Sequence, residues 1–350
     1  MADLRGSGGS GMLQILDYVP EGLLEAQVTD LYRLLGGPTL IHLPGARAEP
    51  LFVSTLLHGN EDTSFYALRA LLRHYRQRPL PRALSIFFGN VQAAEKGLRR
   101  FDDQPDYNRV WPGSESGGTA EHAMMARVTE EMEKRRVFAS VDIHNNTGLN
   151  PHYACVNRID HRYLHLATLF SRTVVYFTRP RGVQSIAFAR LCPAVTVECG
   201  QPGQPHGVEH ALEFMTACLR LSDIPVHPVA PHDLELFHTV AIVKVPEQCS
   251  FSFDDCNTDL CLVPELDRLN FRELPTGTEL ARKAQGESAC LEAWDEYGKN
   301  VGAHYFAHID GRICTRRPVM PSMFTLDESV IRQDCLGYLM ERYILTPAEP

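Results

Sequence analysis

The stretch Leu51-Phe-Val-Ser-Thr-Leu-Leu-His58-Gly-Asn-Glu61 joins an apolar run directly to a histidine and a glutamate. Residues 51–57 have the length of a buried strand, and the next segment has the apolar spacing of a helix. A histidine and a glutamate spaced i, i+3 at a helix start can face one point. Such a pair is more often solvated or capping, but imidazole nitrogen and carboxylate oxygen are also good zinc donors. The stretch therefore predicts a strand and a helix of an α/β fold, and its histidine and glutamate become candidate metal ligands only if a further donor lies at the same edge of the sheet.

Short β-rich runs alternate with helix-length amphipathic segments over the first two thirds of the 350 residues, which is typical of an α/β fold. The expected strands are 39–42, 51–57, 84–88, 139–143, 174–177 and 194–197. Apolar residues repeat at helical spacing over 65–75, 124–132 and 208–219. Prolines at 225, 228 and 231 then interrupt the pattern, and short strands such as 239–245 follow. We predict an α/β hydrolase domain over 12–230 and a smaller β-rich domain over 231–350.

The composition excludes several function classes. Lys and Arg number 34 against 43 Asp and Glu, and the net charge of −9 repels phosphate backbones and anionic lipid surfaces. We therefore expect no nucleic acid partner. No apolar run is long enough to cross a bilayer and no secretion leader is recognisable, so we expect no membrane association. Residues 1–11 are linker-like and are expected to be an expression remnant.

The ten cysteines lie scattered among apolar segments without CxxC pairs. This favours reduced, mostly buried thiols and a cytoplasmic location. Cys249, Cys256 and Cys261 cluster in one region, but their spacing matches no zinc module. The sequence is compatible with a homo-oligomer and contains no signal that decides the oligomeric state.

Two further candidate site residues close apolar runs. His144 follows the expected strand 139–143, and Glu198 follows 194–197. Open α/β sheets bind ligands at the carboxyl ends of their strands, so we expect His58, His144 and Glu198 to meet there. A glutamate in such a place is often a helix N-terminal acid or a buried ion-pair partner. Three titratable residues in the same topological position favour a functional site.

A string of charged and amide residues, 100–109, follows another expected strand and ends in Asp-Tyr-Asn108-Arg109. A guanidinium group binds carboxylates bidentately, and a neighbouring amide can orient them. With these residues the sequence resembles the aspartoacylase and succinylglutamate desuccinylase branch of the zinc carboxypeptidase superfamily. The matching strings are HGNE at 58–61, GN at 89–90, RRF at 99–101, DYNR at 106–109, DIHNN at 142–146 and VECG at 197–200.

The resemblance implies a mixed, doubly wound α/β sheet of the zinc-carboxypeptidase type with a smaller β-rich C-terminal domain. It makes His58, Glu61 and His144 the ligands of one zinc ion per chain and Glu198 the general base. An arginine would polarise the scissile carbonyl. The interval before Asn108 is one residue longer than is usual in the family, so this arginine is either Arg100 or Arg99.

Substrate binding is where the sequence departs from the family. The candidate substrate-binding residues are Asn108, Arg109, Asn145, Arg181 and Gln184. In aspartoacylases an arginine precedes a Ser-Ile-Ala string, whereas here Gln184 does, and Arg181 or Arg190 could compensate. The late tyrosine of aspartoacylases has no match in 318–324. We therefore expect N-acyl derivatives of neutral or polar amino acids to be better substrates than N-acetylaspartate.

These residues together predict a zinc-dependent amidohydrolase that removes the acyl group from an N-acyl amino acid or a related amine. Its partner would be a small carboxylated amide. Two alternatives use the same residues. One is a metallocarboxypeptidase that trims C-terminal residues from peptides, and the other is a catalytically silent binding protein on this scaffold.

Overall fold

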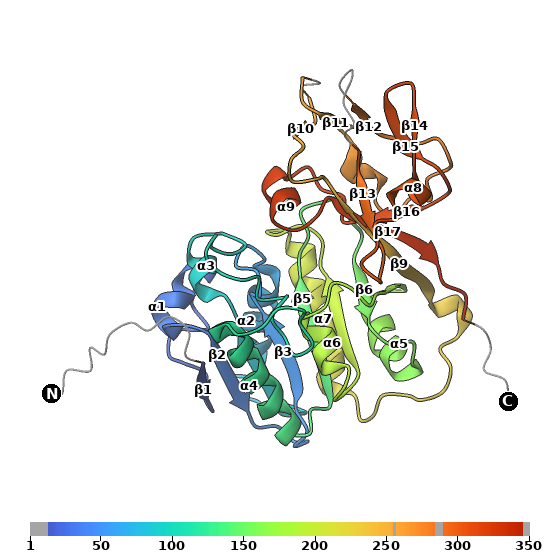
Figure 1. Cartoon of the computed structure of the whole chain (residues 1–350). Helices are drawn as coiled ribbons and strands as arrows, with labels where there is room; N and C mark the ends of the chain where they lie inside the picture. The colour runs from blue at the N-terminus through green and yellow to red at the C-terminus, as the bar shows by residue number, and fades with distance from the viewer. Residues whose placement is uncertain (1–12, 255–256, 284–289, 346–350) are drawn as a thin grey trace.

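The fold is built on one large sheet, shown in Figure 1. The computed structural model describes residues 13–254, 257–283 and 290–345, so the leader 1–11 lies outside the described residues. In spatial order the strands are β1 (Gln14–Leu16), β2 (Thr39–Leu43), β4 (Leu84–Phe88), β3 (Leu51–Thr55), β5 (Ala139–His144), β8 (Ala194–Glu198), β6 (Tyr153–Val156), β7 (Thr173–Tyr176), β9 (Glu235–Lys244), β17 (Gly337–Arg342) and β16 (Met320–Ser322). A twelfth strand, β13 (Glu292–Trp294), pairs with β9.

The sheet is mixed. β3 is parallel to both β4 and β5, and β5 is parallel to β8. In contrast, β2 is antiparallel to β4, and β6 is antiparallel to β8. Every residue of β3, β4, β5 and β8 is buried, which explains why these strands read as continuous apolar runs. The predicted mixed α/β architecture is confirmed.

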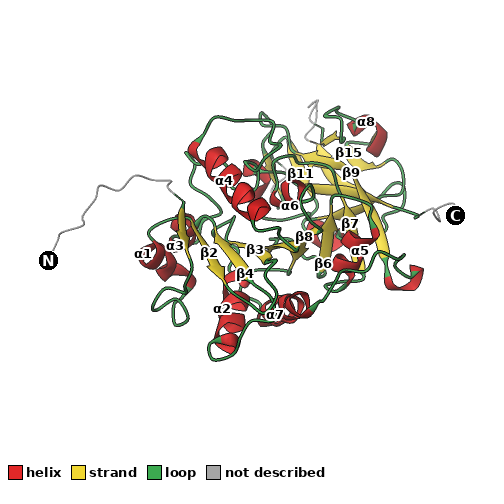
Figure 2. Ribbon diagram, turned by 90° about the horizontal axis from the view of Figure 1, so that it is seen from below, coloured by secondary structure: helices red, strands yellow, loops and turns green. Residues whose placement is uncertain are grey.

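Helices cover both faces of this sheet. Figure 2 shows α2 (Thr63–Tyr75) and α7 (Pro205–Arg220) on one face, with α4 (Ala120–Lys134) and α6 (Gln184–Phe188) on the other. The three long helices match the expected segments, because each buries a stripe of apolar residues at helical spacing. The shorter helices are α1 (Leu31–Leu35), α3 (Val91–Glu95), α5 (His161–Thr168), α8 (Gly302–Tyr305) and α9 (Glu328–Gln333).

The C-terminal part is β-rich, as the change of pattern after the proline cluster predicts. A second sheet holds, in spatial order, β10 (Phe251–Ser252), β11 (Leu260–Leu262), β12 (Glu279–Lys283), β15 (Arg312–Thr315) and β14 (Phe306–Ile309). It lies above the large sheet in Figure 1, and the C-terminal part has its own apolar core. β9 begins after the expected boundary but joins the two parts, because residues 235–238 pair with β7 and residues 237–243 pair with β17. The division at residue 230 stays a prediction.

The chain leaves β3 earlier than expected. The strand ends at Thr55, two residues before the predicted end, because Leu56 takes a left-handed backbone conformation with φ of 55°. Leu56 and Leu57 remain buried, so their apolar character reflects the core and not the strand. The turn directs the following residues across the carboxyl end of the sheet.

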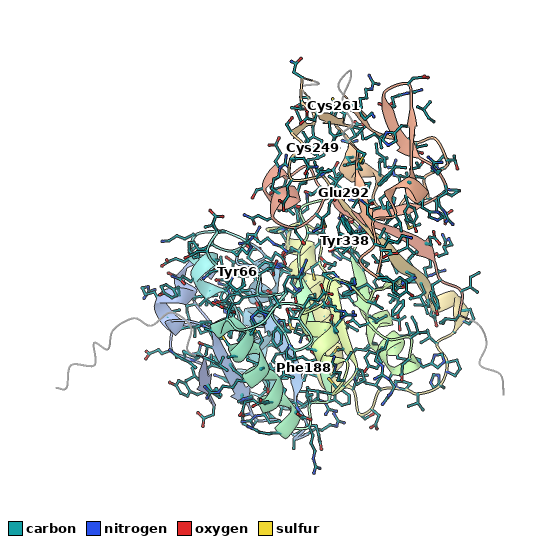
Figure 3. All side chains as sticks on the ribbon, in the orientation of Figure 1. Tyr66, Phe188, Cys249, Cys261, Glu292 and Tyr338 are labelled. Carbon is teal, nitrogen blue, oxygen red and sulfur yellow. The ribbon has the colours of Figure 1, made fainter. Side chains whose placement is uncertain are left out.

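Most described cysteines agree with the expected free thiols. Free thiols are Cys155, Cys192, Cys199, Cys218, Cys290, Cys314 and Cys335, and all of these except Cys290 are buried; Cys249 is buried as well. Cys261 differs, because it is disulfide-bonded; Figure 3 labels both residues in the upper part of the molecule. Cys256 lies outside the described residues. Among the helices of the described chain, none is long and apolar enough to span a bilayer. Cytoplasmic location and homo-oligomer formation stay predictions.

Candidate active site

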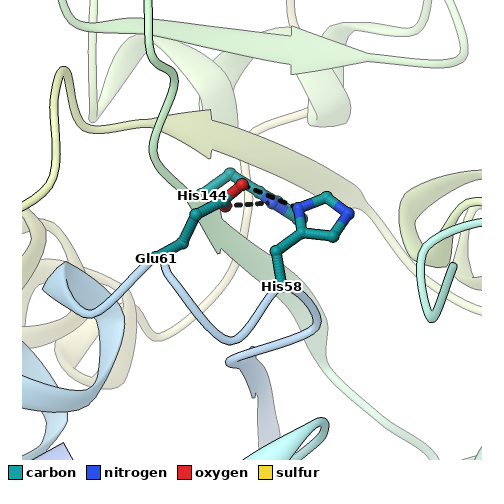
Figure 4. A group of neighbouring side chains, drawn as sticks. All are labelled: His58, Glu61 and His144. Atoms are coloured by element: carbon teal, nitrogen blue, oxygen red, sulfur yellow. Dashed lines mark hydrogen bonds and ion pairs between the residues drawn. The ribbon is translucent and has the colours of Figure 1, made fainter. Parts of the chain in front are cut away.

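Three side chains converge at the carboxyl ends of β3 and β5. His58 and Glu61 come from the turn between β3 and α2, and His144 is the last residue of β5. The Nδ1 atoms of His58 and His144 each lie 2.7 Å from a different oxygen of Glu61, as Figure 4 shows. All three side chains are buried, and their ligand atoms lie within 4.8 Å of one another. Within the described part of the chain, His58, Glu61 and His144 form the group that could hold a metal ion, which we call the metal group.

Carboxylates on the far side of each ring fix the two histidines. His58 Nε2 lies 3.0 Å from Asp106 Oδ1, and His144 Nε2 lies 2.8 Å from Asp142 Oδ2. Such contacts set ring orientation and raise ligand basicity in metal sites. Both rings therefore present Nδ1 inward. Two imidazole nitrogens and one carboxylate are a donor set that suits zinc, so the described residues fit this ion.

The charges of the group support one another. Burial opposes ionisation of Glu61, but His58 and His144 outweigh it and hold the pKa of the carboxyl well below its usual range. For His144, burial favours the neutral ring, and Asp142 and Glu61 overcome it to raise the pKa. Glu61 is thus a carboxylate throughout the neutral pH range.

Close backbone packing fixes the turn that carries His58 and Glu61. A Cβ atom on Gly59 would lie 2.3 Å from the backbone nitrogen of Ala94, so only glycine fits there. The backbone nitrogen of Asn145 donates to Glu61 Oε2 at 3.0 Å. The Asn145 side chain accepts from the backbone of Thr63 and donates to the carbonyl of Gly200. Asn145 lines the pocket, yet its side chain is engaged in bonds that position the metal group.

Glu198 lies beside this group on the neighbouring strand. The register of β5 and β8 places it directly opposite His144. Its carboxylate accepts a hydrogen bond from the Asn146 side chain at 3.3 Å. Burial is the main cause that raises the pKa of Glu198 to about 7, and His144 counteracts part of this effect. A carboxyl group that titrates near neutral pH can both accept and return a proton.

The adjacent Arg99 and Arg100 direct their side chains differently, one toward the pocket and the other toward the loop. Arg99 lines the pocket, and its guanidinium approaches Glu61 Oε1 at 3.6 Å and Asp106 Oδ2 at 3.0 Å. Arg100 donates instead to the backbone carbonyls of Phe101 and Gln104 and is not among the residues that line the pocket. The structure therefore puts Arg99 within reach of the metal group and uses Arg100 to hold the loop.

Asn108 and Arg109 also line the pocket. Asn108 Nδ2 lies 3.1 Å from His144 Nε2, and Asn108 Oδ1 accepts from the backbone of Gln184. Arg109 donates through Nη1 to the carbonyl of Asn108 and through Nη2 to both oxygens of Asp334, at 2.9 and 3.0 Å. The arginine expected to bind a substrate carboxylate thus already contacts a carboxylate of this chain.

The remaining expected residues lie outside this pocket. Gln184 is fully buried, and its Nε2 donates to Ser140 Oγ at 2.6 Å. Arg181 is half-exposed in a neighbouring groove, and Arg190 is exposed. Arg179 lines the pocket although sequence reasoning missed it, and it donates to Glu115 Oε1 at 2.6 Å. Its position between the ends of β7 and α6 carries no sequence signal.

Sequence reasoning also missed four other residues near the site. Asp106 and Asp142 lie inside the strings DYNR and DIHNN, so their place beside ligand histidines could have been suspected. Asp334 and Tyr338 have no such signal, since they come from the region of α9 and β17, far along the chain. Figure 3 shows Tyr338 where the upper and lower parts meet. Apolar side chains such as Val175, Phe177 and Met323 complete the pocket wall.

A group that could hold a metal ion and a buried acid lie together at the strand ends of an α/β sheet, an arrangement suited to hydrolysis. Residues 48–223 match the family model described as the succinylglutamate desuccinylase/aspartoacylase catalytic domain. The chain belongs to this family and is accordingly a hydrolase that acts on a carbon–nitrogen amide bond. No protein with curated annotation matches the chain in sequence.

Solved structures share the fold. Succinylglutamate desuccinylase from Chromobacterium violaceum is 18% identical with a TM-score of 0.57, covering 86% of this chain and 87% of that chain. Murine aminoacylase 3 is 15% identical with a TM-score of 0.55, covering 85% of this chain and 96% of that one. A succinylglutamate desuccinylase/aspartoacylase from Rhodobacter sphaeroides is 15% identical with a TM-score of 0.55, covering 87% and 88%. Since 85–87% of this chain is covered, the likeness in fold extends beyond residues 48–223 and into the C-terminal part.

Proposed function

We propose that this protein is a zinc-dependent deacylase that removes the acyl group from an N-acyl amino acid or a related amine. The observation that carries this proposal is the buried Glu198 carboxyl, with a pKa of about 7, beside His58, Glu61 and His144. Family membership and the names of the similar structures, desuccinylase and aminoacylase, support the same reaction class.

His58, Glu61 and His144 would hold one zinc ion. Bound zinc lowers the pKa of its water to about 7 and polarises carbonyl oxygens. The two ring-orienting contacts, from Asp106 and Asp142, keep both Nδ1 atoms facing inward.

Glu198 would transfer the protons. It accepts a proton from the attacking water and returns it to the nitrogen of the leaving amine, for which a pKa near neutrality is suitable. The bond from Asn146 holds one of its oxygens in place. No covalent intermediate with the protein is required.

Arg99 would assist the carbonyl oxygen as negative charge develops on it. Its place beside Glu61 supports this role over Arg100, whose guanidinium is engaged with loop carbonyls. One substrate carboxylate would bind at Arg109, whose guanidinium has five N–H donors, of which Asp334 and the Asn108 carbonyl use only part. Asn108 borders the same place.

A combined metal and activity measurement tests the function. We expect about one zinc per chain and hydrolysis of members of an N-acyl amino acid panel, run against a matched panel of dipeptides. Cleavage of dipeptides alone would establish the carboxypeptidase alternative. Zinc binding without hydrolysis of either panel would contradict an enzymatic role at this pocket.

A further inference from the structure

Asp334 is a carboxylate that the C-terminal part of the chain contributes to the pocket. It directly follows α9, which lies at the junction of the two parts in Figure 1. Its Oδ1 and Oδ2 accept from Arg109 Nη2, and Oδ2 also lies 3.3 Å from Arg99 Nη2. About three quarters of the Asp334 side chain is buried, since 25% of it is exposed. One carboxylate thus contacts two of the arginines that line the pocket.

The backbone holds Asp334 in this position on both sides. Its own N–H donates to the carbonyl of Val330 at 2.9 Å, which closes α9. The N–H of Leu336 donates to the carbonyl of Val243 in β9, also at 2.9 Å. Asp334 is therefore fixed to the framework of the protein.

The arginines of the pocket are all paired with carboxylates within the described residues. Arg99 contacts Asp106 and Asp334, Arg109 contacts Asp334, and Arg179 contacts Glu115. Around these two arginines the network holds three carboxylates, because Glu61 also lies 3.6 Å from Arg99. Removing Asp334 would take one negative charge from this network and leave Arg109 without its carboxylate partner. Its partners also hold Asp334 ionised, because Arg109 and Arg99 outweigh burial and lower its pKa.

We propose that Asp334 is a specificity-determining residue that limits the site to substrates with a single carboxylate. This inference rests on the proposed deacylase function. One substrate carboxylate can share Arg109 with Asp334. A second carboxylate would lose its water of hydration, meet no uncompensated arginine, and lie in the field of the fixed Asp334 charge. An amide in its place avoids this repulsion.

Isosteric substrate pairs that differ by one charge isolate this effect. N-acetylglutamine with N-acetylglutamate, and N-acetylasparagine with N-acetylaspartate, should be compared on the zinc-loaded protein. We expect wild type to prefer the amide member by about tenfold or more in kcat/KM, because like charges in a partly buried site repel. Asp334→Asn should reduce this preference about tenfold, through the KM of the acidic member. Asp334→Glu should restore the preference, which a merely structural role for Asp334 would not explain.

Asp310→Asn is the matched control, because it removes the same charge from an exposed turn in the C-terminal part. It should leave the preference unchanged. The inference is overturned if wild type prefers the acidic member of each pair. This measurement uses wild type alone, so it does not depend on whether a variant folds. The inference is also overturned if Asp334→Asn keeps the wild-type preference.

A binding measurement separates this inference from the proposed function. Succinate and succinamate differ by one charge, and their dissociation constants can be measured by calorimetry without turnover. If no acyl amino acid is hydrolysed, the deacylase function fails. The inference still stands if Asp334→Asn tightens succinate about tenfold relative to succinamate, and it fails if both constants change equally.

Discussion

The carboxyl ends of β3, β5 and β8 bring together His58, His144 and Glu198, whereas the C-terminal part adds Asp334 and Tyr338 to the same pocket. The first group comes from short strings in which strand, turn and functional residue are adjacent in the sequence. The second group reaches the pocket only through tertiary packing. Under the proposed function, the metal and proton-transfer groups belong to one part of the chain, and substrate selection is shared with the other.

The largest expected effect is on the metal group. His144→Ala removes one of three donors, so we expect zinc content to fall from about one per chain to near zero, with loss of activity. Metal analysis after dialysis measures this. Exposed His232→Ala serves as the control and should keep its zinc. Full zinc occupancy in His144→Ala would remove His144 from the ligands.

The second largest effect is expected on proton transfer by Glu198. Glu198→Gln should keep zinc and fold but lower kcat by roughly a thousandfold or more, because an amide cannot accept the proton of water. Single-turnover kinetics with parallel metal analysis measures this. Loss of zinc in the variant would make Glu198 a ligand instead of a base.

The neighbouring arginines offer a matched pair. Arg99→Ala should lower kcat/KM by roughly a hundredfold, because a donor to the developing negative charge is lost. Arg100→Ala should lower it less than about threefold, since its bonds go to loop carbonyls. The reverse order of effects would show that the loop 98–104 rearranges when substrate binds.

A further expected effect, on stability and not on activity, concerns the pH dependence of unfolding in the metal-free protein. The folded state raises the pKa of Glu198 from 4.5 to about 7, so folding favours the protonated form. This contribution is full below pH 4.5 and is lost as the pH rises through about 7. Relative to wild type, Glu198→Gln should therefore be more stable at pH 8 than at pH 5, by up to about 3 kcal/mol. Urea unfolding at both pH values measures this, and exposed Glu21→Gln should show no such change.

Local signals explain what could be predicted. His58, His144 and Glu198 could be predicted because each directly follows an apolar run, where the topology of an open sheet places ligands. Glu61 could be predicted from its i+3 spacing to His58. The three long helices could be predicted because the apolar residues that each helix buries recur at helical spacing in the sequence. The short strand β6 was missed because its four buried residues have no distinctive period.

Other features depend on tertiary contacts that no local pattern encodes. The choice between Arg99 and Arg100 depends on how an irregular loop packs. Neighbouring residues of this loop direct their side chains to different places, Arg99 to Glu61 and Arg100 to loop carbonyls. Gln184 was expected beside the substrate, but the N-terminus of α6 turns it toward Ser140. Asp334 lies 225 residues from Arg109 along the chain, and only the meeting of the two parts brings them together.

The ladder of backbone hydrogen bonds runs without interruption from β5 through β8, β6, β7 and β9 to β17. The first of these strands ends in His144, and the last begins three residues after Asp334. A hinge motion that swung the C-terminal part away from the metal group would have to break that ladder. The backbone beside Asp334 is therefore tied to the same sheet that carries His144.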